Sequence, residues 1–321
     1  ICLSLLSYTK EMGCFGMFEM LQNLVDENKK YGKEGKLASY IPALLKADVN
    51  DLGIAIVNLD GNEYFAGSCD KKFTIQSISK IISLIIALQD NGIEDVLKKV
   101  DVEPTGEGFN SIVKLETTET GKPYNPMINA GAIATTSLIK GKTEEEKLKK
   151  LIDFIKKATN NPDITINEEV YISEKLTGHR NRALAYFMKS NGILDGNVEE
   201  ILDLYFRQCS IEATARDLAR IGAVLANDGI IPWSGERLID KQICKIVKSI
   251  MVTCGMYDAS GEFAVKIGIP AKSGVGGGIV GSVPKKMGIG VYGPALDEKG
   301  NSIAGIKILE DLSLNLDLSI F

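Results

Sequence analysis

Residues 73–92 read FTIQSISKIISLIIALQDNG, a run in which isoleucine and leucine recur on every face of a helix. A helix that is apolar all round must be buried on every side. Asn91-Gly92 ends this helix, because glycine readily takes the left-handed conformation found at helix C-termini. We therefore predict a buried central helix from Phe73 to Gln89, and the rest of the fold has to be built around it.

A helix and a β-hairpin are predicted upstream of this central helix. The helix runs from about Phe15 to Lys30, and the chain up to about residue 16 is expected to be disordered. Residues 53–60 are apolar and partly β-branched, and Gly61-Asn62 turns the chain into residues 63–67. This pattern is typical of two antiparallel strands joined by a tight turn.

Downstream of the central helix, the chain first carries helical patterns and then returns to short strands. The helical patterns lie at 143–158, 182–191 and 211–227. Short apolar segments separated by Gly, Pro and Asn-Ser turns then predict strands, and a final helix follows them. These strands are predicted at 263–269, 277–283, 288–292 and 304–308.

Strands at both ends of the chain, with a helical insert between them, predict one sheet assembled from the two ends. We accordingly expect three parts. Residues 1–34 form an N-terminal extension with its helix, residues 35–110 and 228–321 form a sheet domain, and residues 111–227 form a helical subdomain.

The chain contains a single histidine, His179. Zinc sites built from two or three histidines are therefore excluded, and a Ser-His-Asp triad would have to use that one residue. The sequence has neither a dinucleotide-binding G-x-G-x-x-G after a strand nor a P-loop. We expect no metal and no organic cofactor.

Charge and cysteine usage limit the classes of partner. The net charge is -5, the pI is about 5.3, and basic residues alternate with acids, so nucleic acid is not expected as a partner. No stretch reaches the roughly 18 uncharged residues of a membrane span, so we expect no membrane partner. The six cysteines form no C-x-x-C pair, which is typical of a reduced protein and predicts a cytoplasmic location.

Because histidine is scarce, the search for a nucleophile turns to a serine activated by a lysine. Ser77 and Lys80 have S-x-x-K spacing at the start of the buried helix. Positions i and i+3 share a helix face, and apolar surroundings lower the pKa of a lysine so that its amine can be neutral. The alternative is that Ser77 merely caps the helix and Lys80 reaches the surface. The same spacing occurs at Ser7, Ser68, Ser111, Ser137 and Ser282, none of which opens a fully buried helix.

Two further segments favour a catalytic reading of Ser77. Lys272-Ser273-Gly274 resembles the lysine-serine/threonine-glycine strand motif that accompanies S-x-x-K enzymes. The glycines there let a substrate approach the backbone closely, so that N–H groups can serve as an oxyanion hole. Residues 125–132, NPMINAGA, concentrate amide side chains and small residues, although a helix begun by proline and capped by asparagine would explain them too.

Together with five more segments, these motifs resemble one family, the glutaminases of bacteria and animal mitochondria. The resemblance runs in the family's order from about Gly35 to Phe321. It implies an α+β fold like that of β-lactamases and penicillin-binding proteins, in which an antiparallel sheet is flanked by helices and carries an inserted all-helical subdomain. The additional segments are Tyr40-Ile41-Pro42, Ser173-Glu174, Arg180-Asn181, Gln208-Cys209-Ser210-Ile211 and Cys254-Gly255-Met256-Tyr257-Asp258.

The resemblance also implies the activity, which is hydrolysis of the side-chain amide of L-glutamine to L-glutamate and ammonia. By resemblance, Ser77 attacks the amide carbon, Lys80 draws the serine proton, and Tyr257 relays protons toward the leaving ammonia. Tyr40 would support the lysine, and the backbone N–H groups of Ser77 and Val275 would bind the oxyanion.

Substrate binding is implied in the same way. Glu174 would hold the α-ammonium group, while Asn129, Asn181 and Tyr205 would surround the rest of the amino acid. Ser77, Tyr257 and Val275 would also contact the substrate. Without the resemblance, each of these residues would be read as an ordinary surface, capping or core residue. Family members commonly form dimers or tetramers, so a homo-oligomer is expected.

Two other functions and one additional residue remain open at this point. The Ser-Lys and Lys-Ser-Gly parts are shared with penicillin-recognising hydrolases, and a catalytically idle relative could bind an amino acid as a sensor.

His179 lies two residues before Asn181, where family members more often have a small or acidic residue. We hypothesise that His179 touches the pocket rim and adds pH sensitivity near neutrality, which an unchanged pH profile of kcat/KM in His179→Asn would refute.

Overall fold

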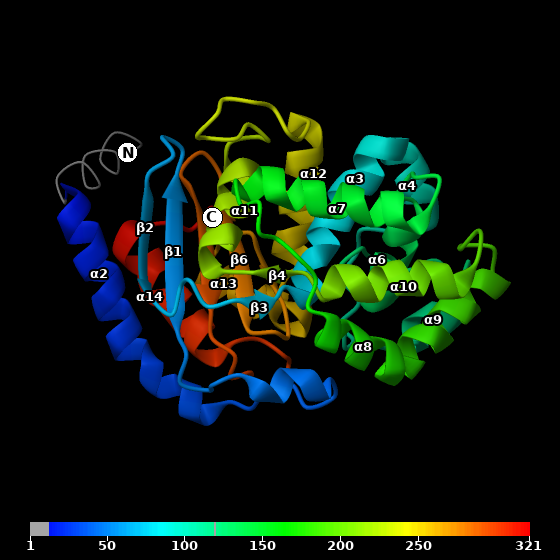
Figure 1. The fold of residues 1–321 in the computed structure, drawn as a ribbon, viewed down its shortest axis with the longest axis horizontal. Helices are drawn as coiled ribbons and strands as arrows, with labels where there is room; N and C mark the ends of the chain where they lie inside the picture. The colour runs from blue at the N-terminus through cyan, green and yellow to red at the C-terminus, as the bar shows by residue number, and fades with distance from the viewer. Residues whose placement is uncertain (1–12, 119) are drawn as a thin grey trace.

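The computed structural model describes residues 13–118 and 120–321 (Figure 1). The described chain begins with helix α2 (Gly13–Asn28), which confirms the predicted N-terminal helix and extends it toward the N-terminus. Most of the segment predicted to be disordered lies outside the described residues, but residues 13–16 belong to α2.

The main sheet has five strands in the order β2-β1-β7-β6-β5, and every neighbouring pair is antiparallel. The first hairpin pairs β1 (Gly53–Asn58) with β2 (Glu63–Gly67), as predicted. The other strands are β5 (Ala271–Ser273), β6 (Gly278–Val283) and β7 (Met287–Tyr292). Because β1 pairs with β7, the sheet joins the two ends of the chain, which confirms the prediction; in Figure 1 the blue strands lie beside the orange ones.

Helices cover both faces of this sheet. On one face, α2 and α14 (Ile303–Leu316) pack with α13 (Ser260–Lys266) around an apolar cluster that contains Ile54, Ile56 and Ile289. On the other face, α11 (Ala215–Ala226) lies against β1, β6 and β7. A Cβ atom on Gly290 would lie 1.8 Å from the Ala215 carbonyl oxygen, so only glycine permits this close helix-sheet contact.

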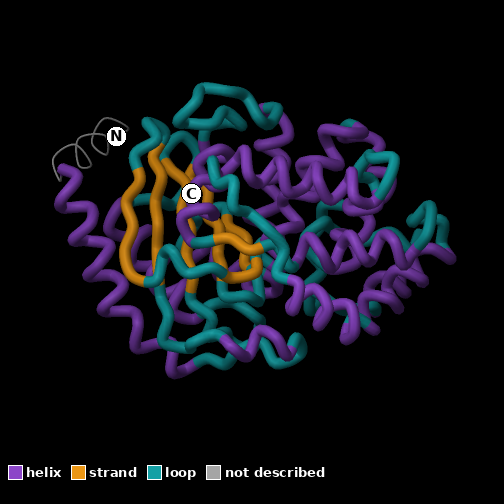
Figure 2. Tube along the Cα trace, in the orientation of Figure 1, coloured by secondary structure: helices purple, strands orange, loops and turns teal. Residues whose placement is uncertain are grey.

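The remaining helices gather beside the sheet, on the right in Figures 1 and 2. The central one is α3 (Ser79–Asn91), whose residues from Ser79 to Leu88 are all buried. It packs against α6 (Asn129–Ser137), α7 (Glu144–Thr159) and α12 (Lys241–Cys254). The others are α4 (Ile93–Lys99), α5 (Val113–Thr117), α8 (Glu168–Thr177), α9 (His179–Ser190) and α10 (Val198–Cys209).

The start of the central helix differs from the prediction. Residues Phe73–Thr74 form strand β3, which pairs with β4 (Glu212–Ala213), and Gln76–Ile78 form the short 3-10 helix η3 before α3 begins. Further short 3-10 helices are η1 (Lys29–Glu34), η2 (Pro42–Lys46) and η4 (Tyr257–Ala259). Burial on every side is confirmed, but the helix proper starts six residues later than predicted.

Two predicted strands are wrong. Residues 263–266 lie in α13 and Ile267 caps its C-terminus; Phe263 and Ile267 are buried four residues apart, while Val265 is 88% exposed. Residues 304–308 lie in α14, where Ala304, Ile308 and Leu312 are buried at intervals of four. Spacing of three to four, rather than alternation, is the pattern of a helix with one apolar face.

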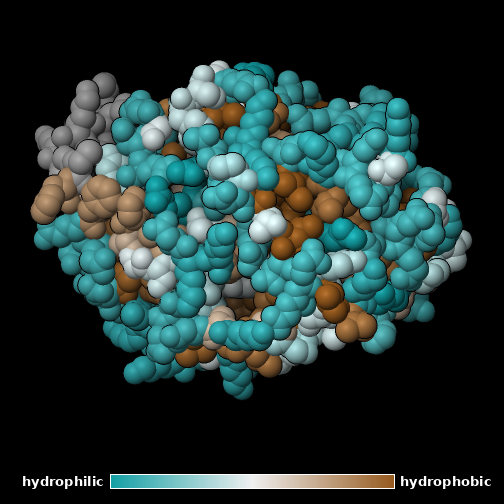
Figure 3. Space-filling view, in the orientation of Figure 1, coloured by the Kyte–Doolittle hydropathy of each residue, from teal (hydrophilic) through white to brown (hydrophobic). Residues whose placement is uncertain are grey.

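The α+β class with an antiparallel sheet flanked by helices is confirmed. The division into domains stays a prediction, and α11, which we assigned to the helical subdomain, packs directly on the sheet. The face of the molecule shown in Figure 3 is mostly hydrophilic, with separate apolar patches. Within the described residues, no helix combines the length and the apolar character needed to cross a bilayer.

Candidate active site

Ser77 is held at the junction of β3 and α3, inside the short helix η3. The Ile75 N–H donates to the Ile211 carbonyl oxygen at 2.8 Å, which ties the segment to the strand-like stretch at β4. Gln76 has a φ of 49°, a left-handed conformation that is uncommon outside glycine and often marks a functional site. Ser77 follows this residue and is only 8% exposed.

The glycine-rich segment after β5 lies directly against the backbone that precedes Ser77. A Cβ atom on Gly274 would lie 2.5 Å from the Ile75 carbonyl oxygen, and one on Gly276 would lie 2.2 Å from the Thr74 carbonyl oxygen. Side chains at these two positions are therefore excluded unless the backbone moves. Val275, between the two glycines, is thereby held close to Ser77.

Lys80 lies in the first turn of α3 and is fully buried. Its Nζ donates to the Met127 carbonyl oxygen at 3.1 Å and to Asn129 Oδ1 at 2.7 Å. Burial lowers the pKa of this amine to about 8, although Cys209 and Glu174 act in the opposite direction. About a tenth of Lys80 is therefore neutral at pH 7, and this neutral form is the one that can act as a base.

The chain bends sharply at Tyr257, which has a φ of 55° and is buried in η4. Its hydroxyl group donates to the Ser273 carbonyl oxygen at 3.2 Å. Burial raises the pKa of Tyr257, while hydrogen bonding with Ser77 and with the Val275 backbone acts to lower it. Tyr257, Ser77 and Val275 therefore meet at one point.

Glu174 of α8 is buried and close enough to Lys80 for their charges to interact. Burial raises the pKa of its carboxyl group to about 7, against a hydrogen bond from Gln76 and the positive charge of Lys80. Asn129 connects the lysine to the next amide, since its Nδ2 donates to Asn181 Oδ1 at 2.9 Å. Acidic, amide and cationic groups thus line one small region, which suits a zwitterionic ligand.

Two tyrosines complete this region. Tyr205 of α10 is buried, and burial raises its pKa well above the ordinary value, with Cys209 and Glu174 adding to the effect. Tyr40 is 54% exposed as a residue, but loss of solvent around its hydroxyl group is the first cause that raises its pKa, followed by Tyr257 and Glu174. The ring thus faces solvent while the hydroxyl group points into the site.

The structure therefore brings together every residue proposed from the sequence for this site. The Ser77-Lys80 pair differs from the other S-x-x-K pairs because its lysine is buried, and the Lys80 side chain donates to Met127 and Asn129. Elsewhere, Lys71 pairs with Asp51 and Lys285 with Asp228 at the surface, while Ser7 lies outside the described residues. His179 is exposed at the start of α9, and its effect on pH sensitivity stays a prediction.

Sequence reasoning gave no role to three residues that lie at the site. Lys272 is fully buried, its Nζ lies 4.2 Å from the centroid of the Tyr257 ring, and it donates to the carbonyl oxygens of Gly255 and Ser273. The ring centroid of Phe109 lies 4.8 Å from that of Tyr257. Gln76 contacts Glu174. The Lys-Ser-Gly motif indicated Lys272. No sequence pattern indicates the loop position of Phe109 or the conformation of Gln76.

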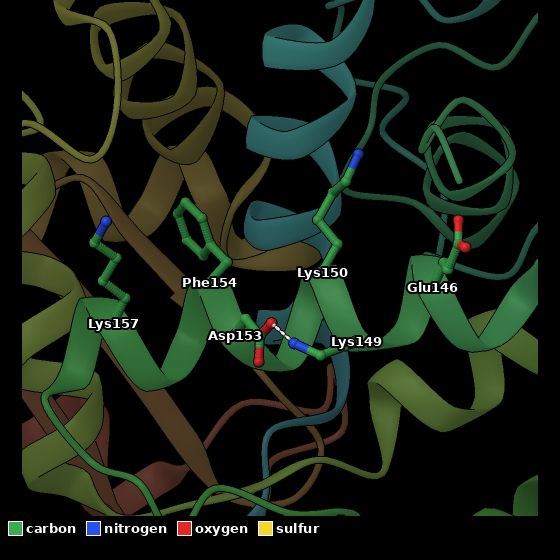
Figure 4. Close-up of a pocket in the computed structure, with 6 residues that line it drawn as sticks. All are labelled: Glu146, Lys149, Lys150, Asp153, Phe154 and Lys157. Carbon is green, nitrogen blue, oxygen red and sulfur yellow. Dashed lines mark hydrogen bonds and ion pairs between the residues drawn. The ribbon is translucent and has the colours of Figure 1, made fainter. Parts of the chain in front are cut away.

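Other parts of the surface do not resemble this site. A shallow depression on α7, about 400 Å³ in volume, is lined mainly by exposed charged residues, and Figure 4 shows Lys149 paired with Asp153 across one helical turn. Across residues 13–118 and 120–321, no group of His, Cys, Asp or Glu side chains is arranged to hold a metal ion.

Known proteins resemble this chain over nearly its whole length. The family profile described as glutaminase matches residues 35–321. Glutaminase 2 of Clostridium perfringens is 63% identical over 305 residues, which cover 95% of this chain and 100% of the relative. The glutaminase of Clostridium tetani is also 63% identical, with the same coverage of both chains.

Solved structures resemble the fold as closely. A Bacillus glutaminase crystallised in 4.3 M NaCl superposes with a TM-score of 0.88 at 44% identity, covering 94% of this chain and 99% of its own. A Bacillus subtilis glutaminase in covalent complex with 5-oxo-L-norleucine, formed by reaction with 6-diazo-5-oxo-L-norleucine, superposes with a TM-score of 0.87 at 43% identity. That superposition covers 95% of this chain and 99% of the other.

Proposed function

The chain belongs to the glutaminase family, and on that premise we propose that Ser77 and Lys80 carry out the hydrolysis of L-glutamine to L-glutamate and ammonia. The observation that carries this assignment is the burial of Lys80. An ammonium group without solvent contact, held one helical turn after a serine by two oxygen acceptors, is costly to build for stability alone.

Acylation begins when Ser77 Oγ attacks the side-chain amide carbon of glutamine. Neutral Lys80 takes the serine proton, and the resulting ammonium group is held by the Met127 and Asn129 oxygens. The new C–O bond forms as the carbonyl π electrons move to oxygen. The backbone N–H groups of Ser77 and Val275 stabilise that oxyanion, a contribution of about 3 kcal/mol for one such donor.

The tetrahedral intermediate then collapses and the C–N bond breaks. Tyr257 contacts Ser77 and the Ser273 carbonyl group, so its hydroxyl group can donate a proton to the departing nitrogen, which leaves as ammonia, while the proton that Lys80 took from Ser77 restores the tyrosine hydroxyl group and leaves Lys80 neutral. Water next attacks the γ-glutamyl ester, and the same groups act in reverse to release glutamate and restore the Ser77 hydroxyl group. Support for a covalent intermediate comes from the B. subtilis relative, which forms a covalent complex with 5-oxo-L-norleucine.

Substrate orientation depends on the groups opposite the nucleophile. Glu174 in its ionised form pairs with the α-ammonium group, and the Asn129 and Asn181 amides with the Tyr205 hydroxyl group bind the rest of the amino acid. Tyr40 places its hydroxyl group near Tyr257 and Glu174, where it supports both the lysine and the ligand. The buried carboxylate favours free glutamine, because its partner is a free α-ammonium group.

The first test is release of glutamate and ammonia from L-glutamine by the purified protein, with Ser77→Ala as the paired variant. Turnover that is lost in the variant supports the assignment. A folded protein, shown by circular dichroism, that leaves glutamine unchanged in both forms would refute it. Hydrolysis of nitrocefin at a rate comparable to that of glutamine would instead favour a penicillin-recognising enzyme.

We also propose that the protein is a cytoplasmic homo-oligomer, either a dimer or a tetramer. The buried, unpaired thiols of Cys69, Cys209, Cys244 and Cys254 support a reducing location. Analytical ultracentrifugation tests the oligomer directly. A monomer at micromolar concentration would contradict it.

A further inference from the structure

A cavity of about 430 Å³ lies beside the active site, between the 104–109 loop and the segment that joins α12 to α13. Its wall includes Phe109, Met127 and Tyr257, each of which touches the catalytic groups. The Met127 carbonyl oxygen accepts from Lys80 Nζ, and the rings of Phe109 and Tyr257 pack together. Ser77 and Glu174 are not part of this wall, so the cavity borders the proposed glutamine site at Tyr257 without including the nucleophile or the carboxylate.

The lining of this cavity has one sign of charge. Glu107 and Asp258 are its charged residues, and both are acidic. Within the part of the chain that the structure describes, neither carboxylate is paired with a basic side chain. Beside these acids, Phe109, Met127 and Ala264 supply apolar surface, and the volume falls within the range of small-molecule sites.

We propose that this cavity, here named the amine pocket, binds a small organic cation in which an ammonium group is attached to an apolar body. The ammonium group pairs with Glu107 and Asp258, and the apolar body packs against Phe109 and Met127. Anions of similar shape are disfavoured, because they would meet two carboxylates and no basic lining residue.

Occupation of the amine pocket also affects turnover. A ligand there packs against Phe109 and Tyr257 and restricts the tyrosine that relays the proton, so kcat falls. KM changes less than kcat, because Glu174, Asn129 and Asn181 lie outside the pocket. This kinetic effect rests on the role proposed above for Tyr257, whereas binding itself does not.

Calorimetric titration with 2-phenylethylammonium chloride tests the binding, and 3-phenylpropionate serves as the anion of similar size. We expect saturable binding of the cation at one site and binding of the anion at least about tenfold weaker. The double variant Glu107→Gln/Asp258→Asn weakens cation binding by about tenfold or more, since a charge-assisted contact is lost. Glu262→Gln, which removes a carboxylate of α13 that pairs with Lys266 outside the pocket, leaves binding unchanged.

A second variant tests the same pocket in case the double variant does not fold. Ala264→Phe fills the pocket from α13 without changing its charge and abolishes cation binding. The proposal is overturned if the cation does not saturate, if the anion binds equally well, or if neither variant weakens binding. In kinetic assays the cation lowers kcat more than it changes KM. If binding holds but Tyr257→Phe keeps full turnover, then the proposed role of Tyr257 fails and the amine pocket remains as a binding site.

Discussion

The active site and the outer surface of α7 both place a lysine and a carboxylate side chain, but in opposite environments. At the active site, Lys80 and Glu174 are buried and their pKa values are moved to about 8 and about 7. On α7, Lys149 and Asp153 form an exposed ion pair, with side-chain exposures of 74% and 53% (Figure 4). Burial, rather than residue type, therefore makes lysine and glutamate chemically useful at neutral pH.

The largest effect is expected at the centre of the buried region. Replacement of Ser77 by Ala removes the attacking oxygen, and we expect kcat/KM for glutamine to fall by at least about 10³-fold. The unfolding midpoint should change little, because one hydroxyl group is lost. Steady-state ammonia release together with thermal unfolding measures both. Retention of more than a tenth of the activity would show that another nucleophile operates.

The next largest effect concerns the buried carboxylate. Glu174→Gln keeps the size of the side chain but removes its charge, so we expect KM to rise by about tenfold to a hundredfold with a smaller change in kcat. On α7, Glu146→Gln is a matched control with the same chemistry at an exposed position, and it should leave KM unchanged. Equal KM values in the two variants would remove Glu174 from the substrate site.

The pH dependence should separate the two buried groups. Glu174 must be ionised to bind an α-ammonium group, so KM should fall as pH rises through about 7. Lys80 must be neutral to act as a base, so kcat should rise as pH passes through about 8. Rate profiles between pH 5.5 and 9.5 measure both the change in KM and the change in kcat. Flat profiles across this range would contradict the assigned roles.

A smaller effect is expected where the glycine-rich segment touches the Ser77 segment. Gly276→Ala places a Cβ atom 2.2 Å from the Thr74 carbonyl oxygen, so the backbone must shift, with a cost of about 1–3 kcal/mol in the free energy of unfolding. Gly261→Ala on α13 meets no atom within 4 Å and is the matched control. Urea unfolding compares the two variants. Equal stabilities would mean that the close contact is not required.

The smallest effect is expected on α7. Asp153→Ala breaks the exposed pair with Lys149, and we expect a loss of no more than about 0.5 kcal/mol in the free energy of unfolding, with activity unchanged. Urea unfolding and the glutamine assay would reveal a larger change. A loss of activity in Asp153→Ala would contradict the prediction that this exposed ion pair does not affect turnover.

The sequence allowed the buried helix, the sheet built from both chain ends and the segments that meet at the candidate site to be predicted. The burial of α3 could be predicted because isoleucine and leucine recur on every face of the helix, and the site residues could be predicted because they lie in ordered motifs. The prediction failed where an apolar composition fits either a strand or a helix. Residues 304–308 are apolar enough for a strand, but the spacing of Ala304, Ile308 and Leu312 fits α14.

The parts of the site that sequence could not supply are those fixed by tertiary contact. The left-handed conformation of Gln76 arises because the preceding backbone is held by β4 and by the glycine-rich segment. The position of Phe109 depends on a loop that carries no periodic pattern. Such features depend on partners more than a hundred residues away, and no local propensity encodes them.

The most direct test of the account is peptide mapping after reaction with 6-diazo-5-oxo-L-norleucine, with Lys80→Met compared with the unaltered protein. We predict that the added mass lies on the peptide that contains Ser77, and that labelling at pH 8 is at least about a hundredfold slower in Lys80→Met, because the base is absent. An adduct on any other residue, or equal labelling rates in the two proteins, would contradict the claim that a buried lysine activates Ser77.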